Sequence, residues 1–382
     1  MQTYPVYFWP RGTLASHLGS DTVFGAVCWA IRLLEQADVG ELLANFDIHP
    51  RFAFSALSPV FRTMRNGTHS EVRFYPRPLL PAISPQQVEA LAKATQRSRE
   101  SVIEAKMRIL ENAKEIKQRA YLSESLFTDI ITGKTTMADL LRRLKKSGLG
   151  ADDVEAIGNA LISHAERLQL QSVGKLRDIV READVQHTHV DRVAGGTVEG
   201  LLFLEQEIYF RAGGGLWCVL RTDDAALENL IKPALRYLED TGLGANRTTG
   251  KGHFRIEIGA PMQLPQASQP NCFVALSRYL PRPDEWSATD MPLHYELLNL
   301  WPKRENQFPS VVAGQRSAPV RKRRLRVFAP GSVFPLNSIN VRPLYGQLAE
   351  VVPADQGPHS VWQSGITVPV AAHITTEEGA GP

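Results

Sequence analysis

The chain has 382 residues, of which 43% are hydrophobic and 22% are charged, and its formal net charge at pH 7 is +3. This length and composition predict a globular protein with room for two domains and exclude disordered and collagen-like classes. Cys28, Cys218 and Cys272 are too far apart for a C-x-x-C metal motif and too few for a disulfide framework, which indicates a reducing, cytoplasmic setting. The longest early apolar run, residues 24–31, is too short to span a bilayer, so no membrane insertion is expected.

The beginning of the chain alternates strand-like and helix-like patterns. Residues 4–9 are rich in aromatic and branched side chains, which predicts a strand. The segment Ser20-Asp21-Thr22 carries capping side chains ahead of apolar residues at helical spacing, so a helix with one face on the core should begin there. Residues 52–61 and 72–79 are predicted to form a strand pair with a turn at residues 65–67.

A helical insertion is predicted over residues 84–182. Its first segment, Ser84-Pro85-Gln86-Gln87, combines a capping serine, a first-turn proline and a capping-box glutamine, so a long helix should start here. Two shorter helices are expected over residues 136–146 and 153–170. This block interrupts an otherwise mixed domain.

The remainder of that domain alternates again. The expected elements are strands over residues 201–211 and 215–221, a helix over 223–241 kinked at Pro233, and a strand over 253–258. Without the insertion, this order is close to a ferredoxin-like (RRM-like) βαββαβ domain with one extra strand, over residues 1–260.

A smaller domain is expected after a linker. Three prolines between residues 261 and 270 mark that linker. Short strand-like segments and a helix over residues 293–300 then predict a second ferredoxin-like domain over 271–372, and residues 373–382 predict a flexible tail. The expected fold class is therefore α+β, with tandem ferredoxin-like (RRM-like) domains and a helical insertion.

A glycine-rich loop, residues 242–252 with the sequence GLGANRTTGKG, lies between the last predicted helix and strand of the first domain. It is not a P-loop, because Ala245 replaces the first glycine and Gly252 replaces the Ser/Thr; Arg247 also breaks the dinucleotide motif. Four glycines allow close approach of the backbone to a ligand, and polar and basic side chains supply donors. The candidate binding residues of this loop are Gly244, Asn246, Arg247, Thr248, Thr249 and Lys251. A turn with incidental charges is the alternative.

A second basic feature lies in residues 316–326, which contain six basic residues and no acidic one. An anionic partner is one interpretation of this cluster, and a solvated charge run is the other.

Four stretches, in order, resemble the RAMP superfamily of CRISPR effector proteins, and within it the family of type III-A subunits that cap the CRISPR RNA. They are SDTVFGAVCWAI at residues 20–31, VDRVAGGTVEGLLF at 190–203, the glycine-rich loop, and RKRRLRVFAPGSVF at 321–334. The sequence departs from the family pattern at Ala245, where glycine is more common, and in the length of the insertion.

The resemblance implies a subunit without catalytic residues, cofactor or metal that acts in an antiviral, RNA-targeting complex. Its implied RNA partners are the 5′ handle of CRISPR RNA and the duplex of guide and target RNA. Its implied protein partners are a large polymerase/cyclase-like subunit and an adjacent RAMP subunit of the backbone filament.

The resemblance also adds candidate RNA-binding residues to those of the loop. The amide groups at Ser20 and Thr22 are candidates for a phosphate, although capping is the more ordinary use of Asp21 beside them. His189 and Arg192 lie in a segment that resembles the family's thumb, which presses against the guide–target duplex. The family's basic strand adds Arg321 and Arg323.

Three other interpretations remain open at this stage. The segment from His187 to Arg192 resembles a dizinc H-x-H-x-D-H motif, but Arg192 replaces the last ligand and a cation repels zinc. A RAMP endoribonuclease that processes CRISPR RNA precursor would need a base such as His17. The third interpretation is a purely structural interaction module. Co-purification distinguishes the alternatives: an RNA with a uniform 5′ end favours handle binding, cleaved precursor hairpins favour the endoribonuclease, and protein alone favours the structural module.

Overall fold

The structure is a computed structural model that describes the chain except for residues 66–67, 146–149, 151, 171–177, 192, 286–293, 302–310, 313–314, 317–321, 337–340, 354–359 and 376–382. Two candidate residues, Arg192 and Arg321, lie outside the described residues, as do most of the expected tail and two residues of the first expected turn. Among the helices of the described part, none is both long enough and apolar enough to cross a membrane.

Four antiparallel strands form the centre of the main sheet in the order β11-β1-β10-β3, and β2 also pairs with β10. Their bounds are β1 Gln2–Pro10, β2 Phe52–Phe54, β3 Ser58–Arg65, β10 Gly214–Thr222 and β11 Phe254–Ile258. Taking β2 and β3 as one interrupted strand, this spatial order is 4-1-3-2, as in a single βαββαβ unit. The α+β class expected from the sequence is therefore confirmed.

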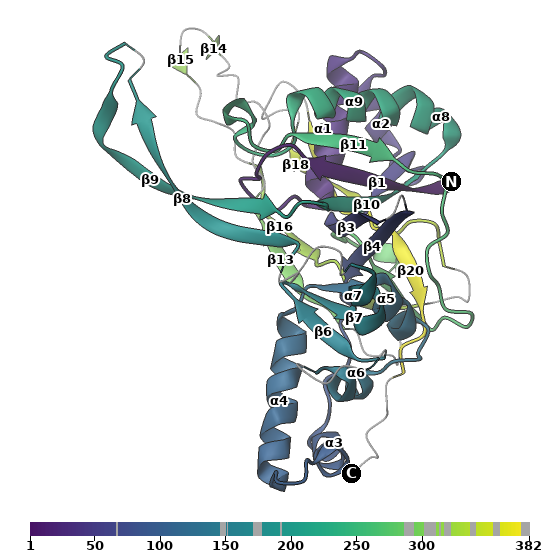
Figure 1. The fold of residues 1–382 in the computed structure, drawn as a ribbon. Helices are drawn as coiled ribbons and strands as arrows, with labels where there is room; N and C mark the ends of the chain where they lie inside the picture. The colour runs from purple at the N-terminus through teal and green to yellow at the C-terminus, as the bar shows by residue number, and fades with distance from the viewer. Residues whose placement is uncertain are drawn as a thin grey trace.

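The helices of this unit cover one side of the sheet (Figure 1). They are α1 Ser20–Leu33, the short α2 Val39–Ala44, and α8 Asp224–Ala226 continuing through a π-helical turn, Leu227–Ile231, into α9 Lys232–Thr241. Pro233 stands in the first turn of α9, so the expected irregularity takes the form of a π turn just before the proline.

The insertion is mixed rather than purely helical. Its elements are α3 Pro85–Thr95, α4 Val102–Gln118, β5 Tyr121–Ser123, α5 Glu124–Ile131, α6 Met137–Arg143, β6 Val154–Ile157, β7 Ala160–Ser163 and α7 His164–Gln169. The single long helix expected from residue 84 is two helices, because Ser101 and Glu104 form a second capping box. The helix expected over residues 153–170 is confirmed only at its end, as α7; before α7 the prediction was wrong, because Gly158, with φ of 50°, turns the chain between β6 and β7.

These strands extend the main sheet. Its order continues from β3 through β4 (Thr68–Pro76) to β5, β7 and β6. Figure 1 shows α3 and α4 projecting from the body at that end of the molecule. The insertion is thus anchored by backbone pairing, and only its helical pair stands apart.

The segment after the linker consists of short strands. They are β12 Cys272–Ala275, β13 Leu297–Leu300, β14 Val311–Val312, β15 Gln315–Arg316, β16 Leu325–Phe328, β17 Val333–Pro335, β18 Leu348–Val352, β19 Val361–Ser364 and β20 Pro369–Ala372. The helix expected over residues 293–300 was wrong, since β13 occupies its described end and pairs with β16. No α-helix occurs here within the described residues, so a second ferredoxin-like domain remains a prediction.

This segment packs directly on the first unit. Val274, Leu276 and Val368 belong to the same buried cluster as residues of α1 and β2. The Ser277 hydroxyl donates a 3.0 Å hydrogen bond to the carbonyl oxygen of Phe54. The chain therefore has one continuous core across the expected linker.

A long hairpin leaves the body between the insertion and β10. It consists of β8 (Val180–Val190) and β9 (Thr197–Phe210), which pair only with each other in the sheet topology. In Figure 1 the hairpin extends away from the rest of the molecule as a two-stranded arm. The expected strand over residues 201–211 is its second half.

Candidate nucleic-acid interface

The glycine-rich loop owes its shape to left-handed backbone positions. Gly242, Gly244, Gly250 and Gly252 have φ between 72° and 92°, and Asn246 has φ of 59°. A Cβ at Gly252 would overlap the carbonyl oxygen of Leu243, so only glycine fits there. The glycines thus set the path of the loop, as the sequence predicted.

The loop is held against the segment that follows β1. The amide of Gly252 donates a 2.7 Å hydrogen bond to the carbonyl oxygen of Thr13, and a Cβ at Gly12 would lie 2.7 Å from the carbonyl oxygen of Gly250. Two segments distant in sequence therefore meet backbone to backbone.

The tip of the loop faces solvent. Asn246, Thr248 and Thr249 are exposed, Arg247 is partly buried, and residues 247–249 form a 3-10 turn. The Thr249 hydroxyl donates to the carbonyl oxygen of Asn246 at 2.8 Å. The Asn246 amide donates to Glu205, so the side chain of Asn246 is tied to β9. The turn carries a guanidinium and the Thr248 hydroxyl beside these bonded groups, and such polar groups are suited to phosphate and sugar oxygens.

Lys251 does not belong to this exposed set. It is only 5% exposed, and its ammonium group forms ion pairs with Glu205 and, at 2.9 Å, with Glu207 of β9. Burial alone would lower the pKa of Lys251, but the hydrogen bonds to Glu205 and Glu207 outweigh it and leave the pKa raised. The expectation that Lys251 offers its charge to a phosphate therefore needs correction: its charge is already neutralised within the chain.

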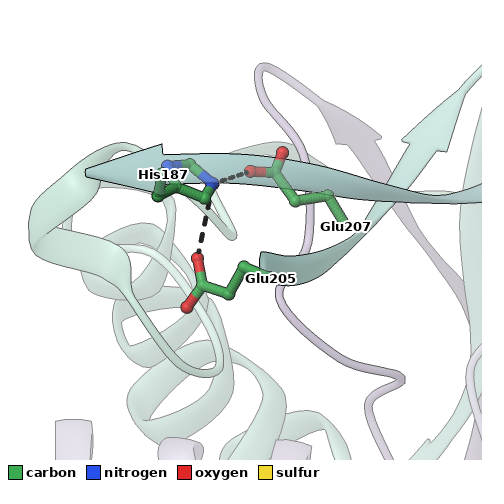
Figure 2. A group of neighbouring side chains, drawn as sticks. All are labelled: His187, Glu205 and Glu207. Atoms are coloured by element: carbon green, nitrogen blue, oxygen red, sulfur yellow. Dashed lines mark hydrogen bonds and ion pairs between the residues drawn. The ribbon is translucent and has the colours of Figure 1, made fainter. Parts of the chain in front are cut away.

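The partners of Lys251 form a cluster at the base of the hairpin. His187 lies 3.0 Å from Glu207 and 3.7 Å from Glu205, and Figure 2 shows the three side chains pointing toward one another. Burial raises the pKa of Glu207, but its bonds to Lys251, Thr13 and His187 are stronger in sum and lower it to about 2. The cluster ties the glycine-rich loop to the hairpin.

A histidine and two carboxylates within 4.8 Å of one another are also a metal-ligand set by residue type. Here, however, the ammonium group of Lys251 bridges the two carboxylates. A cation at this place would have to displace Lys251 and meet its charge. The arrangement fits an internal ion-pair network better than a metal centre.

The N-terminus of α1 is occupied by the C-terminal segment. The Ser20 hydroxyl accepts a 3.2 Å hydrogen bond from the amide of Arg278, and Asp21, 7% exposed, pairs with the Arg278 guanidinium at 2.5 Å. Gln363 also donates to Asp21. Ser20 is buried and Thr22 is partly buried, so this helix end serves an internal contact. The N-cap residue is Gly19, so Asp21 is not the cap that the sequence predicted.

The outer part of the hairpin is apolar as well as exposed. His189 is exposed, whereas His187 is partly buried. Both imidazoles lie against Phe203, with ring centroids 5.6 and 5.5 Å away. Exposed aliphatic side chains follow: Val190, Val193, Leu201, Leu202 and Leu204. The sequence did not predict that these side chains are exposed. In a strand with one buried face, apolar and polar residues alternate, but here apolar residues lie on both faces of the ribbon.

The remaining candidates are separate from the loop. Arg323 is exposed just before β16, and its amide donates a 2.8 Å hydrogen bond to the carbonyl oxygen of Val351. His17 is exposed and pairs with Glu182 of β8 at 2.6 Å. His17, Glu182 and Tyr121 contribute to the lining of a cavity of about 90 Å³ whose other walls are largely aliphatic. The structure thus brings a tyrosine near His17, which the sequence did not predict.

Comparison with known proteins agrees with the motifs. No family model matches the chain. A 75-residue segment is 33% identical to the "CRISPR system Cms protein Csm4" of Thermococcus onnurineus (strain NA1), a match that spans 20% of this chain and 25% of that relative. The fold is similar to a chain of the Csm1–Csm4 cassette crystallised with pppApA, with a TM-score of 0.54 and 18% identity over 98% of this chain and all of that one.

A chain of the Csm3–Csm4 subcomplex of the type III-A CRISPR-Cas interference complex gives a TM-score of 0.58 with 13% identity, over 97% of this chain and 99% of that one. Both likenesses extend over nearly the whole chain, so the class of fold is that of the subunits in these complexes. Together with the matching segment, they confirm the resemblance drawn from the four motifs. In fold the chain is similar to chains of these Csm complexes, and over 75 residues it is similar in sequence to a Csm4 protein.

Proposed function

We propose that this protein is a non-catalytic subunit of a type III-A CRISPR complex that holds the 5′ handle of the CRISPR RNA. The observation that carries the proposal is the exposed tip of the glycine-rich loop, with Arg247, Asn246, Thr248 and Thr249 on one turn whose backbone is held by glycines and by residues 12–13. A single-stranded handle offers phosphates and 2′-hydroxyls, which such donors recognise.

The proposed protein partners follow from the similar structures, one of which contains Csm1 and another Csm3. By analogy, this subunit joins the large polymerase/cyclase-like subunit to the first backbone RAMP subunit. The tandem arrangement of ferredoxin-like domains belongs to the same proposal. The 4-1-3-2 strand order supports it for the first unit.

The β8–β9 hairpin is proposed to contact the guide–target duplex. Beyond its base cluster the hairpin carries exposed aliphatic side chains: Val193, between the two strands, is 98% exposed, and Leu204, next to the base cluster, is 71% exposed. Apolar side chains of this kind wedge against bases, and no phosphate contact is needed for that. His189, exposed on β8, remains a candidate for a contact with the RNA backbone, and so does Arg192, which lies outside the described residues.

Arg247 and Lys251 provide the test of handle binding. In full-length protein titrated with single-stranded handle RNA at several salt concentrations, Arg247→Ala should weaken binding and reduce the magnitude of the log–log salt slope by about 0.7, the value for one phosphate contact. Lys251→Ala, the matched control, removes the same charge from an internal ion pair and should lower thermal stability without changing the slope. An unchanged slope for Arg247→Ala in a folded protein would contradict the proposal.

A further inference from the structure

The β13–β16 ribbon carries a surface that the handle-binding loop does not explain. In this antiparallel pair Asn299 is opposite Arg326 and Leu300 is opposite Leu325, so the next residues outward, Trp301 and Arg324, continue the register. Directly opposed residues share a face, and so do residues two apart on one strand. Trp301, Arg324, Asn299 and Arg326 therefore lie on one face of the ribbon.

At the end of the ribbon that carries Trp301, this face is exposed, whereas residues of the opposite face are buried or partly buried. Leu300 and Val327 of the same strands are buried, whereas Arg324, Asn299 and Arg326 are exposed. Trp301 is 65% exposed, an unusual position for the largest apolar side chain. Packing of the core thus fixes the ribbon through one face and leaves the other to solvent.

Trp301 is held in place by a cation. The guanidinium carbon of Arg324 lies 3.5 Å from the centroid of the indole, the shortest of the cation–π distances between described residues. This contact orients the ring and leaves most of its surface open, because the guanidinium covers only one side of the indole.

The charge beside the ring is uncompensated by acids of the described chain. Arg326 donates through Nε to the amide oxygen of Asn299 at 3.2 Å, and no described carboxylate forms an ion pair with Arg323, Arg324 or Arg326. Elsewhere the chain neutralises such groups: Arg62, which also stacks on an aromatic ring at 4.4 Å, is paired with Glu71 and Glu257. The charge of Arg62 is thus neutralised by carboxylates, whereas the charges of Arg324 and Arg326 are not neutralised by any described carboxylate.

We propose that this ribbon binds unpaired nucleotides of RNA, with Trp301 stacking on a base and Arg324 and Arg326 contacting phosphates on either side of it. An oriented indole next to unpaired guanidinium groups is the combination that single-stranded nucleic acid requires. An acidic protein surface would form ion pairs with the arginines but would offer no base to stack on the exposed indole of Trp301. The inference rests on the proposed function and adds a second RNA contact, distinct from the glycine-rich loop.

Stacking and charge contacts differ in their salt dependence, and this difference defines the test. With full-length protein and single-stranded handle RNA, Trp301→Ala should weaken binding roughly 5- to 150-fold with the salt slope unchanged, and Trp301→Phe should retain most of the affinity. Arg326→Ala should instead lower the magnitude of the slope by about 0.7. Arg32→Ala, which removes a guanidinium 5.5 Å from the ring of Trp29 on α1, is the matched control and should leave binding unchanged.

Photocrosslinking with 5-iodouridine RNA gives an independent readout, since the reactive base must lie against an aromatic ring. A crosslink on the peptide that contains Trp301 is expected. Normal affinity of folded Trp301→Ala together with no crosslink would overturn the ribbon proposal, and the handle proposal would stand if Arg247→Ala still weakened binding. Failure of the wild-type chain to bind RNA would overturn both, and loss of a protein partner alone in Trp301→Ala would mean that the ribbon is a protein contact.

Discussion

At the scale of single residues, Lys251 shows how the surroundings decide the role of a side chain. Lys251 and Arg247 are both basic residues in a glycine-rich loop, so the sequence suggests a phosphate contact for each. Its ammonium group is buried between Glu205 and Glu207, however, and the cost of burying one charge is offset by the two opposite charges. Arg247, four residues earlier, is partly buried on a turn whose neighbouring residues are exposed.

This network predicts a dependence of stability on pH. Since the pKa of Glu207 is lowered to about 2 in the folded chain, its ionised form contributes stability above the pKa of an unfolded glutamate, about 4.3, and that contribution is lost as pH falls toward 2. Chemical unfolding between pH 6 and pH 2 should give a flatter pH dependence for Glu207→Gln than for wild type. The variant should also be less stable at neutral pH.

The control for this measurement is Glu111→Gln, which alters an exposed carboxylate on α4. It should follow the wild-type pH curve. If Glu207→Gln did so as well, the ion pairs with Lys251 would contribute nothing to folding.

At the scale of elements, the β8–β9 hairpin is unusual because it pairs with itself and has few other contacts. Residues near its base meet the body through Glu207 and through the bridge between Leu14 and Ile208. Beyond this base both faces of the ribbon are open to solvent, and an isolated two-stranded hairpin is marginally stable at best. Its exposed aliphatic tip is therefore expected to gain order from a partner.

Limited proteolysis measures this gain. Cleavage within residues 188–202 should be rapid in the free chain and slower once the protein is assembled on a guide–target RNA duplex, because ordering reduces access to the protease. The double variant Leu202→Ser/Leu204→Ser should fold normally, since both side chains are exposed, but should lose this protection. Equal cleavage of wild type with and without the duplex would contradict the proposed contact.

At the scale of the whole molecule, the first unit and the C-terminal segment share a core, so we expect them to unfold together. The buried cluster that contains α1 and β2 also contains Val274 and Leu276 of the C-terminal segment. Polar contacts reinforce this junction through Asp21, which meets Arg278 and Gln363. The division at residues 261–270 is thus a change of composition in the sequence without a break in the core.

Asp21→Ala should reveal this coupling in urea unfolding. Loss of one partner leaves Arg278 uncompensated at a mostly buried site, and such changes cost about 3–5 kcal/mol. A single transition at lower urea concentration is expected. As a control, Glu89→Ala removes exposed pairs with Lys93 and Lys106 and should shift the urea midpoint much less. Two separate transitions in the wild-type chain would show that the halves fold independently.

The absence of catalysis is also a prediction for the whole molecule. Purified protein incubated with CRISPR RNA precursor or target RNA, with and without Mg²⁺, should leave both uncut. His17 is the test residue, because it lies beside Glu182 and shares a cavity with Tyr121. Specific cleavage by wild type that disappears in His17→Ala would favour the endoribonuclease alternative.

The sequence by itself determined the local features of this protein. The strand over residues 4–9, the helix from Ser20 and the glycine-rich loop were predictable because side-chain pattern, capping and left-handed backbone positions depend on neighbours in sequence. The ordered motifs also indicated the RAMP resemblance. Where helical preference is weak, strand pairing decided the structure instead. Residues 154–163 form a local hairpin that turns at Gly158, and β13 pairs with the more distant β16.

Only the tertiary structure decided which charged residues remain available to a ligand. Lys251 and Asp21 lie in segments that the sequence marks as binding sites, yet partners from β9 and from the C-terminal segment neutralise them. Trp301 and Arg324 form a stacked pair because the β13–β16 register places them opposite each other. Whether a charged side chain is available to a ligand depends on contacts between residues that are far apart in the sequence. Core packing and strand pairing fix those contacts.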